Sequence, residues 1–348
     1  MGELRKPRAW LVVNGQSIPC MDADATVTTL SSSDTFSASI PLGALPEGMD
    51  EAFWADEPEI KAQMVFATDP SGSDRKVLVD GKITQVDIEW GARMLRVNGK
   101  DATADLLHAK SNEKFLNQKA EEIVKTIAGR HGLSVETDGQ TNKAGKTYQI
   151  DWNKLTDLHS EAAILQHLAD IEGKVWFVNG QKLTFKKADD DSLPAFQVQY
   201  VAPTAQSYEQ GTFIRLRTLR NVELAKKVKV NVRSWNTKSK EVVKSEKELD
   251  GGGEQPLVYE YRAPGLNQEQ ADRIAEKRLE ENTRHERTVD VDMPGDLSVD
   301  AHMKLTLSGT GTSFDQDYAI DAVEHRIGMG EGYRMSIRSK SKSKKRGK

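Results

Sequence analysis

The seven histidines of this 348-residue chain could bind a metal or transfer a proton, so their spacing is considered first. His159 and His167 stand eight positions apart on a predicted helix, which separates them by about 12 Å along its axis. Two histidines that chelate one metal from a helix stand four positions apart, and no HExxH pattern occurs. His285, His302 and His325 fall on strands or strand edges of the last block, where their convergence depends on the fold. Spacing alone therefore predicts no metal centre.

Carboxylates and glycines give no catalytic or phosphate-binding pattern either. The consecutive residues Asp189, Asp190 and Asp191 are typical of a solvated turn and lack the alternating ligands of a calcium loop. Neither GxSxG nor GxxxxGK[ST] occurs, and Gly251-Gly252-Gly253 leads into Glu and Pro rather than into a helix with a lysine. We predict no catalytic residues, no cofactor and no metal.

Cys20 is the only cysteine, so one chain can form neither an internal disulfide nor a thiolate metal site. The redox compartment stays open. No stretch of 18 apolar residues is present, and the N-terminal sequence MGELRKPRAW lacks the apolar core of a signal peptide. We expect no membrane segment and no secretory route.

The net charge of -4 is unevenly distributed along the chain. Residues 340–348 carry six basic and no acidic side chains, whereas the preceding 339 residues carry 43 basic and 53 acidic ones, a net charge of -10. An acidic body argues against a nucleic-acid-binding fold with a cationic face. The tail can contact phosphates or an acidic partner nonspecifically, and it can equally be a solvated extension. Its candidate electrostatic contact residues are Lys340, Lys342, Lys344, Lys345, Arg346 and Lys348.

The elements that must position these side chains begin with a β-rich block. Alternation of apolar and polar residues predicts strands at 8–15, 24–30, 35–42, 59–68, 76–90 and 93–100. Asn14-Gly15, Asp80-Gly81 and the loop from Asp69 to Asp74 supply turn chemistry, with Gly81 offering a positive φ. We predict a small antiparallel barrel or sandwich as the first domain, residues 1–105.

A second domain, residues 106–205, is predicted to be α+β. Residues 117–131 carry an apolar stripe at helical spacing, and a second helix is predicted at 158–171. A hairpin whose strands join through Asn179-Gly180 follows directly.

The strand pattern returns in a third domain, residues 206–339. One helix interrupts it near 267–284, and the Gly-rich run 250–255 is interpreted as a mobile loop tip. The chain is thus predicted to be a β-rich α+β protein with two similar small antiparallel β-barrels separated by an α+β insert. The second barrel has a helical insertion, and the basic tail 340–348 is predicted to be flexible.

An internal repeat connects the two β-rich blocks. Ile83-Thr-Gln-Val86, followed by Arg93-Met94 and Val97, is similar to Ile320-Asp-Ala-Val323, followed by Arg334-Met335 and Ile337. The second copy has four more residues in its turn. Two unrelated hairpins and two similar barrels both explain this repeat.

Two segments resemble a known family. The run VNGKDATADLLHA at 97–109 resembles the junction between the first barrel and the second domain in the baseplate hub proteins of phage tails. The run ELAKKVKVNVRSWNTKSKEVV at 223–243 resembles the lysine-rich strand and Ser-Trp-Asn turn that begins the second barrel in the late control D family. These proteins are related to the hub part of type VI secretion spikes. Their order of domains matches the predicted order over nearly the whole chain.

The resemblance implies a structural, non-enzymatic protein of the virion tail baseplate, assembled in the host cytoplasm. It implies a homotrimer whose six barrels form a pseudo-sixfold ring between the sixfold tail tube, or a distal tail protein, and the threefold central spike. The tail is expected to be contractile, with tape-measure protein and DNA in transit through the channel and baseplate wedge or sheath components as further partners. Some tryptophans are candidate interface anchors, although core packing is expected for most of them: Trp10, Trp54, Trp90, Trp152, Trp176 and Trp235.

Two alternatives come from other functional classes. A hub that cuts peptidoglycan needs an acid and a nucleophile in a cleft of a further domain, and the predicted elements already use the chain. A nucleic-acid-binding β protein rests only on the basic tail 340–348, and truncation of that tail should abolish such binding.

Overall fold

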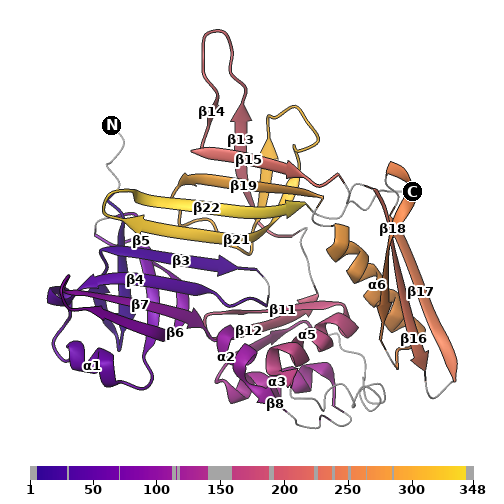
Figure 1. Cartoon of the computed structure of the whole chain (residues 1–348), viewed down its shortest axis with the longest axis horizontal. Coiled ribbons are helices and arrows are strands. Elements are labelled where there is room, and N and C mark those ends of the chain that lie inside the picture. Colours follow the sequence, from indigo (N-terminus) through magenta and orange to yellow (C-terminus); the bar gives the residue numbers. More distant parts are fainter. Residues whose placement is uncertain are drawn as a thin grey trace.

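The computed structural model describes the chain except for residues 1–5, 30, 70, 112–114, 116–117, 140–158, 188–191, 223–225, 237–239, 250–251, 264, 284–285 and 342–348. A 14-stranded sheet forms its main body. Figure 1 shows the first part of this sheet in indigo at the left and the second part in yellow and orange above it. An α+β domain lies below, and a three-stranded sheet with one helix lies at the right (Figure 1). The prediction of a β-rich protein with few helices is confirmed.

The first β unit folds around one apolar core. Each of its strands contributes side chains to that core, Leu11, Ile18, Phe36, Met64 and Leu95 among them, because alternate residues of each strand point inward. Two short helices, η1 (Leu42–Ala44) and α1 (Glu51–Asp56), lie between the fourth and fifth strands. The strands are β1 (Arg8–Val13), β2 (Gln16–Pro19), β3 (Asp22–Thr28), β4 (Thr35–Pro41), β5 (Lys61–Ala67), β6 (Lys76–Glu89) and β7 (Met94–Asp101).

The turn predictions for this unit are confirmed at Asn14-Gly15 and wrong at Asp80-Gly81. Asn14 and Gly15 have φ values of 49° and 78° and connect β1 to β2. Gly81 lies inside the 14-residue strand β6 and does not have a positive φ. A glycine is needed at this position because the backbones of β6 and β7 approach each other closely: a Cβ on Gly81 would lie 2.0 Å from the Lys100 carbonyl oxygen.

The second β unit has a core of its own, built from residues such as Val291, Leu305, Tyr318, Val323 and Ile337. An arm formed by its first two strands projects at the top of Figure 1. The strands are β13 (Ala195–Val201), β14 (Gln210–Gly211), β15 (Arg215–Arg220), β19 (Arg287–Pro294), β20 (Lys304–Ser308), β21 (Asp317–Gly328) and β22 (Gly332–Ser341).

The two units repeat one five-stranded arrangement. The order β3-β4-β7-β6-β5 in the first unit corresponds to β15-β19-β22-β21-β20 in the second, and every neighbouring pair is antiparallel. The registers also agree. Pro41 ends β4 opposite Met94, and Pro294 ends β19 opposite Arg334.

The predicted repeat lies at the centre of this arrangement, and both copies contain the same irregularity. The ladder between β6 and β7 skips Thr84, and the ladder between β21 and β22 skips Asp321, which is the equivalent residue. A shared bulge at one register position is a specific feature that two unrelated hairpins would not be expected to have. The repeat therefore reflects two similar units.

The predicted alignment of the repeat is wrong by one residue after the turn. Val97 and Ile337 are equivalent, but Met335 corresponds to Leu95 and Arg334 corresponds to Met94. Glu89 pairs with Met94 five positions later, whereas Arg326 pairs with Arg334 eight positions later. The second turn is thus longer by three residues rather than four.

The two units are joined into one sheet through an antiparallel ladder between β3 and β21, from Thr28 opposite Ala322 to Ala23 opposite Ile327. Each unit folds around a separate core while sharing this ladder. The description of each unit as a small barrel stays a prediction.

The α+β insert has its own core of helix and strand side chains, which include Leu106, Ile127, Leu168 and Trp176. Both predicted helices and the hairpin through Asn179-Gly180 are confirmed, whereas the first helix, of six residues, was not predicted. The elements are α2 (Thr103–His108), β8 (Lys110–Ser111), α3 (Ala120–Arg130), β9 (Ser134–Thr137), β10 (His159–Ser160), α5 (Glu161–Glu172), β11 (Lys174–Asn179) and β12 (Lys182–Lys187).

Helix α5 shows why these segments begin and end where they do. The Ser160 hydroxyl accepts a hydrogen bond from the Ala163 backbone N–H at 3.2 Å, which satisfies one of the free donors of the first turn. Gly173 ends the helix with a φ of 64°, a conformation that glycine adopts without strain.

A separate insertion connects β15 to β19. It contains β16 (Lys226–Asn236), β17 (Glu241–Leu249), β18 (Gly252–Arg262) and α6 (Gln268–Thr283), with the helix packed on the three-stranded sheet. The helix predicted near 267–284 is confirmed, and its N-terminus is closed by reciprocal hydrogen bonds between Asn267 and Gln270.

Two predictions about this insertion need correction. Gly252 to Gln255 belong to β18 and are not a loop tip, while Asp250 and Gly251 lie outside the described residues. The lysine-rich run with Ser234-Trp235-Asn236 forms β16 of the insertion and does not begin the second β unit. That run lies on a sheet separate from the 14-stranded one.

The domain ranges 1–105, 106–205, 206–339 and 340–348 stay predictions. Strand pairing adds one fact to them, because β13 pairs with β20 and so belongs to the sheet of the second unit. This favours a second boundary before Ala195.

Candidate assembly surfaces

His302 and His325 are packed against aromatic side chains in different parts of the fold. His325 is buried, and its Nδ1 lies 2.7 Å from the Tyr333 hydroxyl. Burial lowers the pKa of His325 to about 4 and also lowers the pKa of His302, which stacks on Phe177 with ring centroids 4.2 Å apart. Within the described ranges no three His, Cys, Asp or Glu side chains form a group suited to a metal ion. His285 and Asp189 to Asp191 lie outside those ranges.

One histidine makes a close contact with a carboxylate. Glu161 at the start of α5 is buried, and its carboxylate lies 2.8 Å from an Arg130 guanidinium nitrogen and 2.5 Å from His131 Nε2. Arg130 and His131 stand at the C-terminal end of α3, where cationic side chains are favoured by the helix dipole. The contact holds α3 against α5 and is therefore structural.

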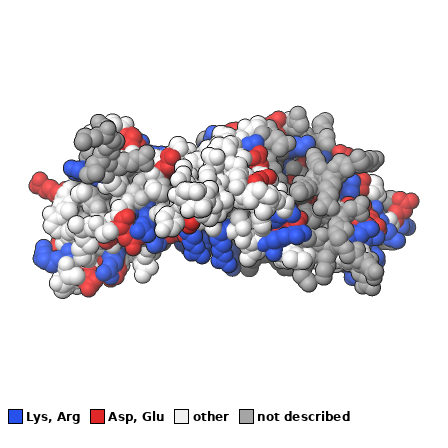
Figure 2. Space-filling view, turned by 90° about the horizontal axis from the view of Figure 1, so that it is seen from above, with Lys and Arg blue, Asp and Glu red and all other residues white. Residues whose placement is uncertain are grey.

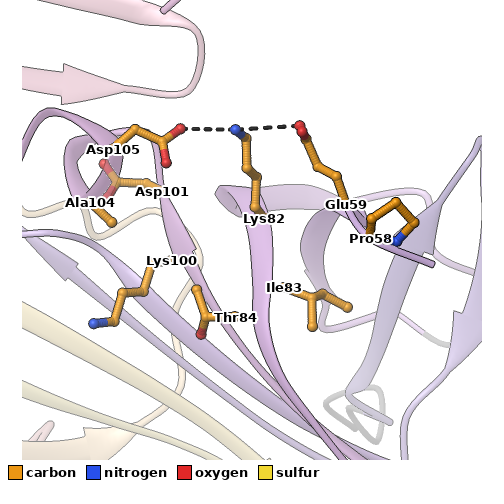
Figure 3. Close-up of a pocket in the computed structure, with 9 residues that line it drawn as sticks. All are labelled: Pro58, Glu59, Lys82, Ile83, Thr84, Lys100, Asp101, Ala104 and Asp105. Carbon is orange, nitrogen blue, oxygen red and sulfur yellow. Dashed lines mark ion pairs between the residues drawn. The ribbon is translucent and has the colours of Figure 1, made fainter. Parts of the chain in front are cut away.

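A shallow pocket of about 230 Å³ lies where β6, β7 and α2 meet (Figure 3). Lys82 stands at its centre, with Nζ 3.0 Å from an Asp105 oxygen and 3.3 Å from a Glu59 oxygen. The hydrogen bond from Lys82 to Asp105 raises the pKa of the lysine, so the ammonium stays charged. The pocket is smaller than usual ligand sites, and its ion pairs fasten α2 and the segment before β5 to the sheet.

Two buried carboxyl groups show the structural role of the segment 97–109, which resembles the junction of baseplate hub proteins. Asp34 Oδ1 accepts hydrogen bonds from the backbone N–H of Thr28 at 2.7 Å and from its hydroxyl. Asp101 accepts from the Ser33 hydroxyl and from the Thr103 hydroxyl, both at 2.6 Å. Burial raises the pKa of Asp34 to about 7 and raises that of Asp101 as well. These groups join the β3–β4 turn to the end of β7 and the start of α2, so the motif is a structural junction.

The predicted electrostatic tail is only partly described. Lys340 lies in β22, with Nζ 2.7 Å from Asp321 Oδ2, and so it is part of a strand rather than of a flexible tail. The other candidate contact residues lie outside the described residues: Lys342, Lys344, Lys345, Arg346 and Lys348.

The charged side chains do not form one broad cationic face in the view of Figure 2. Acidic side chains are scattered over that face, and basic side chains gather near the middle of its lower border (Figure 2). None of the helices in the described part of the chain has both the length and the apolar composition needed to cross a membrane.

Several exposed apolar residues are candidates for contacts with other proteins. Trp90, directly after β6, is 67% exposed. Ile214, directly before β15, and Leu219, within it, are 58% and 44% exposed. Tyr208, on the projecting arm, is 89% exposed. Trp10, Trp54 and Trp176 are buried, Trp90 and Trp235 are exposed, and Trp152 lies outside the described residues.

Sequence reasoning did not find these surfaces. The residues of β6 and β15 alternate like those of any strand, so their exposure depends on which edges the fold covers. The repeat was the one available signal, because it implied two units with equivalent edges.

A family model described as phage tail baseplate hub (GPD) matches residues 60–331, well over half of the chain. No curated protein matches the sequence.

Several solved structures share the fold. A tail protein from Neisseria meningitidis MC58 superposes with a TM-score of 0.71 at 13% identity, covering 97% of this chain and 96% of that one. The 43 kDa tail protein of prophage MuSo2 from Shewanella oneidensis gives a TM-score of 0.65 at 11% identity, with 95% and 97% covered. A type VI secretion component from E. coli, described as similar to the T4 bacteriophage tail proteins gp27 and gp5, gives 0.55 at 10% identity, with 97% and 77% covered.

Proposed function

The chain belongs to the phage tail baseplate hub (GPD) family, and we propose that three copies form a pseudo-sixfold ring joining the tail tube to the central spike. The family places the protein in the virion tail baseplate as a structural component.

The internal duplication carries this proposal. Two β units with the same strand order and the same register occur in each chain, so a ring of three chains contains six similar units. Such a ring has true threefold and approximate sixfold symmetry, which suits contact with a threefold body on one face and a sixfold tube on the other. Exposed apolar residues on β6, on β15 and on the projecting arm support large protein interfaces.

The partners proposed for this ring are those that the family resemblance implies. One face takes the tail tube or a distal tail protein, and the opposite face takes the central spike. Tape-measure protein and DNA pass through the channel, and wedge or sheath components of a contractile tail contact the outside. The ring is proposed to assemble in the host cytoplasm.

We assign no reaction to this hub. The buried carboxyls Asp34 and Asp101 accept hydrogen bonds from turn and helix residues, and Lys82 is held by two ion pairs, so each of these groups has a structural role. A peptidoglycan-cutting hub and a nucleic-acid-binding protein acting through 340–348 stay as alternatives. No observation on the described residues favours either of them.

The solution mass of the purified protein tests the proposal. Light scattering after size exclusion, at several concentrations, should give three times the chain mass of 38.7 kDa. Addition of the tube protein and of the spike protein should then give a stable complex. A monomer at every concentration that also binds neither protein would overturn the ring.

A further inference from the structure

The ladder between β3 and β21 shows how one unit docks on the other within a chain. Inward-facing residues at this junction are covered, with Ala23, Ala25 and His325 all buried. Facing outward, Arg326 on β21 lies directly opposite Asp24 on β3, and Arg326 Nε is 2.5 Å from Asp24 Oδ1. The junction thus combines backbone pairing, apolar cover and one cross-strand ion pair.

Because the two units are equivalent, each strand of this junction has a counterpart in the other unit. The registers make β6 the counterpart of β21 and β15 the counterpart of β3. Glu89 is then equivalent to Arg326, and Arg217 is equivalent to Asp24. Every unit therefore has one edge like β3 and one edge like β21.

Both counterpart edges are open over the described part of the chain. Strand β5 pairs with β6 only as far as Lys82, and β7 covers the opposite edge, so 85–89 has one unpaired side. Strand β15 pairs with β19 alone. Open strand edges of this kind readily accept a further strand.

The side chains at the open edges are less covered than their counterparts. Ile88 is partly buried against the core of the first unit, whereas its counterpart His325 is buried. Thr218 is exposed, whereas its counterpart Ala25 is buried. This difference is expected if each open edge is completed by another strand.

The charges at these edges are complementary to each other and reversed relative to the junction within the chain. If β6 meets β15 in the same register, Glu89 faces Arg217, whereas Arg326 faces Asp24 inside the chain. A wrong pairing of β6 with β3 would place Glu89 against Asp24, and a pairing of β21 with β15 would place Arg326 against Arg217. Both wrong pairings bring like charges together, so the edges select their own partner.

From this complementarity we propose that β6 of one copy pairs antiparallel with β15 of a second copy of this chain, in the register that β21 and β3 use. Gln85 then lies opposite Asn221, Asp87 opposite Leu219, and Glu89 opposite Arg217 of the neighbouring copy. The contact is head-to-tail, so it closes a ring when the rotation fits. This interface deepens the proposed ring and rests on it.

Charge exchange at one pair tests the interface. In the full-length protein, Glu89→Arg should raise the concentration at which the trimer half-dissociates by about tenfold or more, because two guanidinium groups would then face each other at this position. Arg217→Glu should have a similar effect, and the double variant should recover most of the loss. Arg233 and Glu260 form an exposed ion pair on the separate three-stranded sheet, so Arg233→Glu with Glu260→Arg is the matched control. The control pair should leave trimer dissociation unchanged.

Disulfide capture tests the register. Asp87→Cys with Leu219→Cys places two thiols opposite each other, and oxidised glutathione should convert them to a disulfide between copies. The control Asp87→Cys with Arg217→Cys is two residues out of register on the same outward row and should cross-link far less. Native Cys20 is half-buried, and burial raises the pKa of its thiol to about 12, so it competes little.

The outcomes separate this interface from the ring itself. The strand pairing is overturned if neither single charge variant changes trimer dissociation. It is also overturned if the cysteine pair in the predicted register cross-links no better than the control pair. Neither outcome contradicts the trimeric ring. Efficient cross-linking in the predicted register into open chains longer than three copies supports the pairing and contradicts the closed trimer. Cross-linked trimers together with rescue in the double charge variant support both.

Discussion

Gly99 on β7 is expected to tolerate no larger residue unless Phe36 on β4 becomes smaller. The two residues are direct neighbours in the ladder, and a Cβ on Gly99 would lie 2.0 Å from Cζ of the buried Phe36 ring. The ring lies across the space that a side chain would need. We therefore expect Gly99→Ser to destabilise the protein by about 2 kcal/mol through overpacking.

The second β unit has a smaller residue in place of the Phe and a larger one in place of the Gly at the same register position. Val289 and Ser339 replace the Phe and Gly pair, both are buried, and the Ser339 hydroxyl donates to the Val289 carbonyl oxygen at 2.9 Å. Phe36→Val alone should cost about 2 kcal/mol because it leaves a cavity. Combined with Gly99→Ser it recreates the pair of the second unit. The double variant should then lose about 2 kcal/mol or less, instead of the roughly 4 kcal/mol that independent effects would give.

Urea unfolding of the purified variants, followed by tryptophan fluorescence and circular dichroism, measures these free energies. Gly91→Ser is the control, because Gly91 has open space around its Cβ position, and it should change stability by less than about 0.5 kcal/mol. Additive losses in the double variant would refute the equivalence of the two pairs.

Three further predictions concern other parts of the chain. Because burial raises the pKa of Asp34 to about 7, the folded protein keeps a proton that the unfolded chain releases near pH 4, so the free energy of unfolding should fall between pH 4 and 7. Asp34→Asn should flatten this decline in urea titrations at different pH values. Asp170→Asn should reduce the free energy that holds α6 against α5 by about 1–3 kcal/mol, since the Asp170 carboxylate binds Lys277 at 2.6 Å and Arg278 at 2.8 Å. Hydrogen exchange in α6 should then rise, while that in β1–β7 stays constant. Truncation after Ser341 should leave the protein trimeric in light scattering, and a loss of the trimer would show that the basic tail takes part in assembly.

Local patterns in the sequence predicted the elements whose stabilising contacts are local. The apolar stripe of α3 and the Asn179-Gly180 hairpin were found because spacing and turn residues alone determine them. Helix α1 was missed, since it spans only six residues and depends on the Asp50 cap and on burial of Trp54. Gly81 was misread as a turn because the same residue type also serves where two backbones approach closely.

The assembly surfaces needed the fold. The β3–β21 ladder joins residues about 300 positions apart, as in the contact of Arg326 with Asp24, and no periodicity reports such a pairing. The spacing of histidines and carboxylates predicts no metal or catalytic site, and this stays a prediction. Which edges stay uncovered could not be stated from the sequence.

The insertion between β15 and β19 returns to the point where it leaves the sheet. Arg220 pairs with Arg287, and the Asn221 backbone N–H donates to the Glu286 carbonyl oxygen at 2.7 Å, so the ends of the insertion are neighbours in one ladder. The first unit closes the same position with the short turn that contains Asp34. Closing a folded segment between adjacent ladder positions adds little strain to the sheet, and the entropy of closure grows only slowly with length. The insertion can therefore be replaced by another segment without altering the register between β15 and β19. Each chain carries one such insertion, although each chain contains two β units.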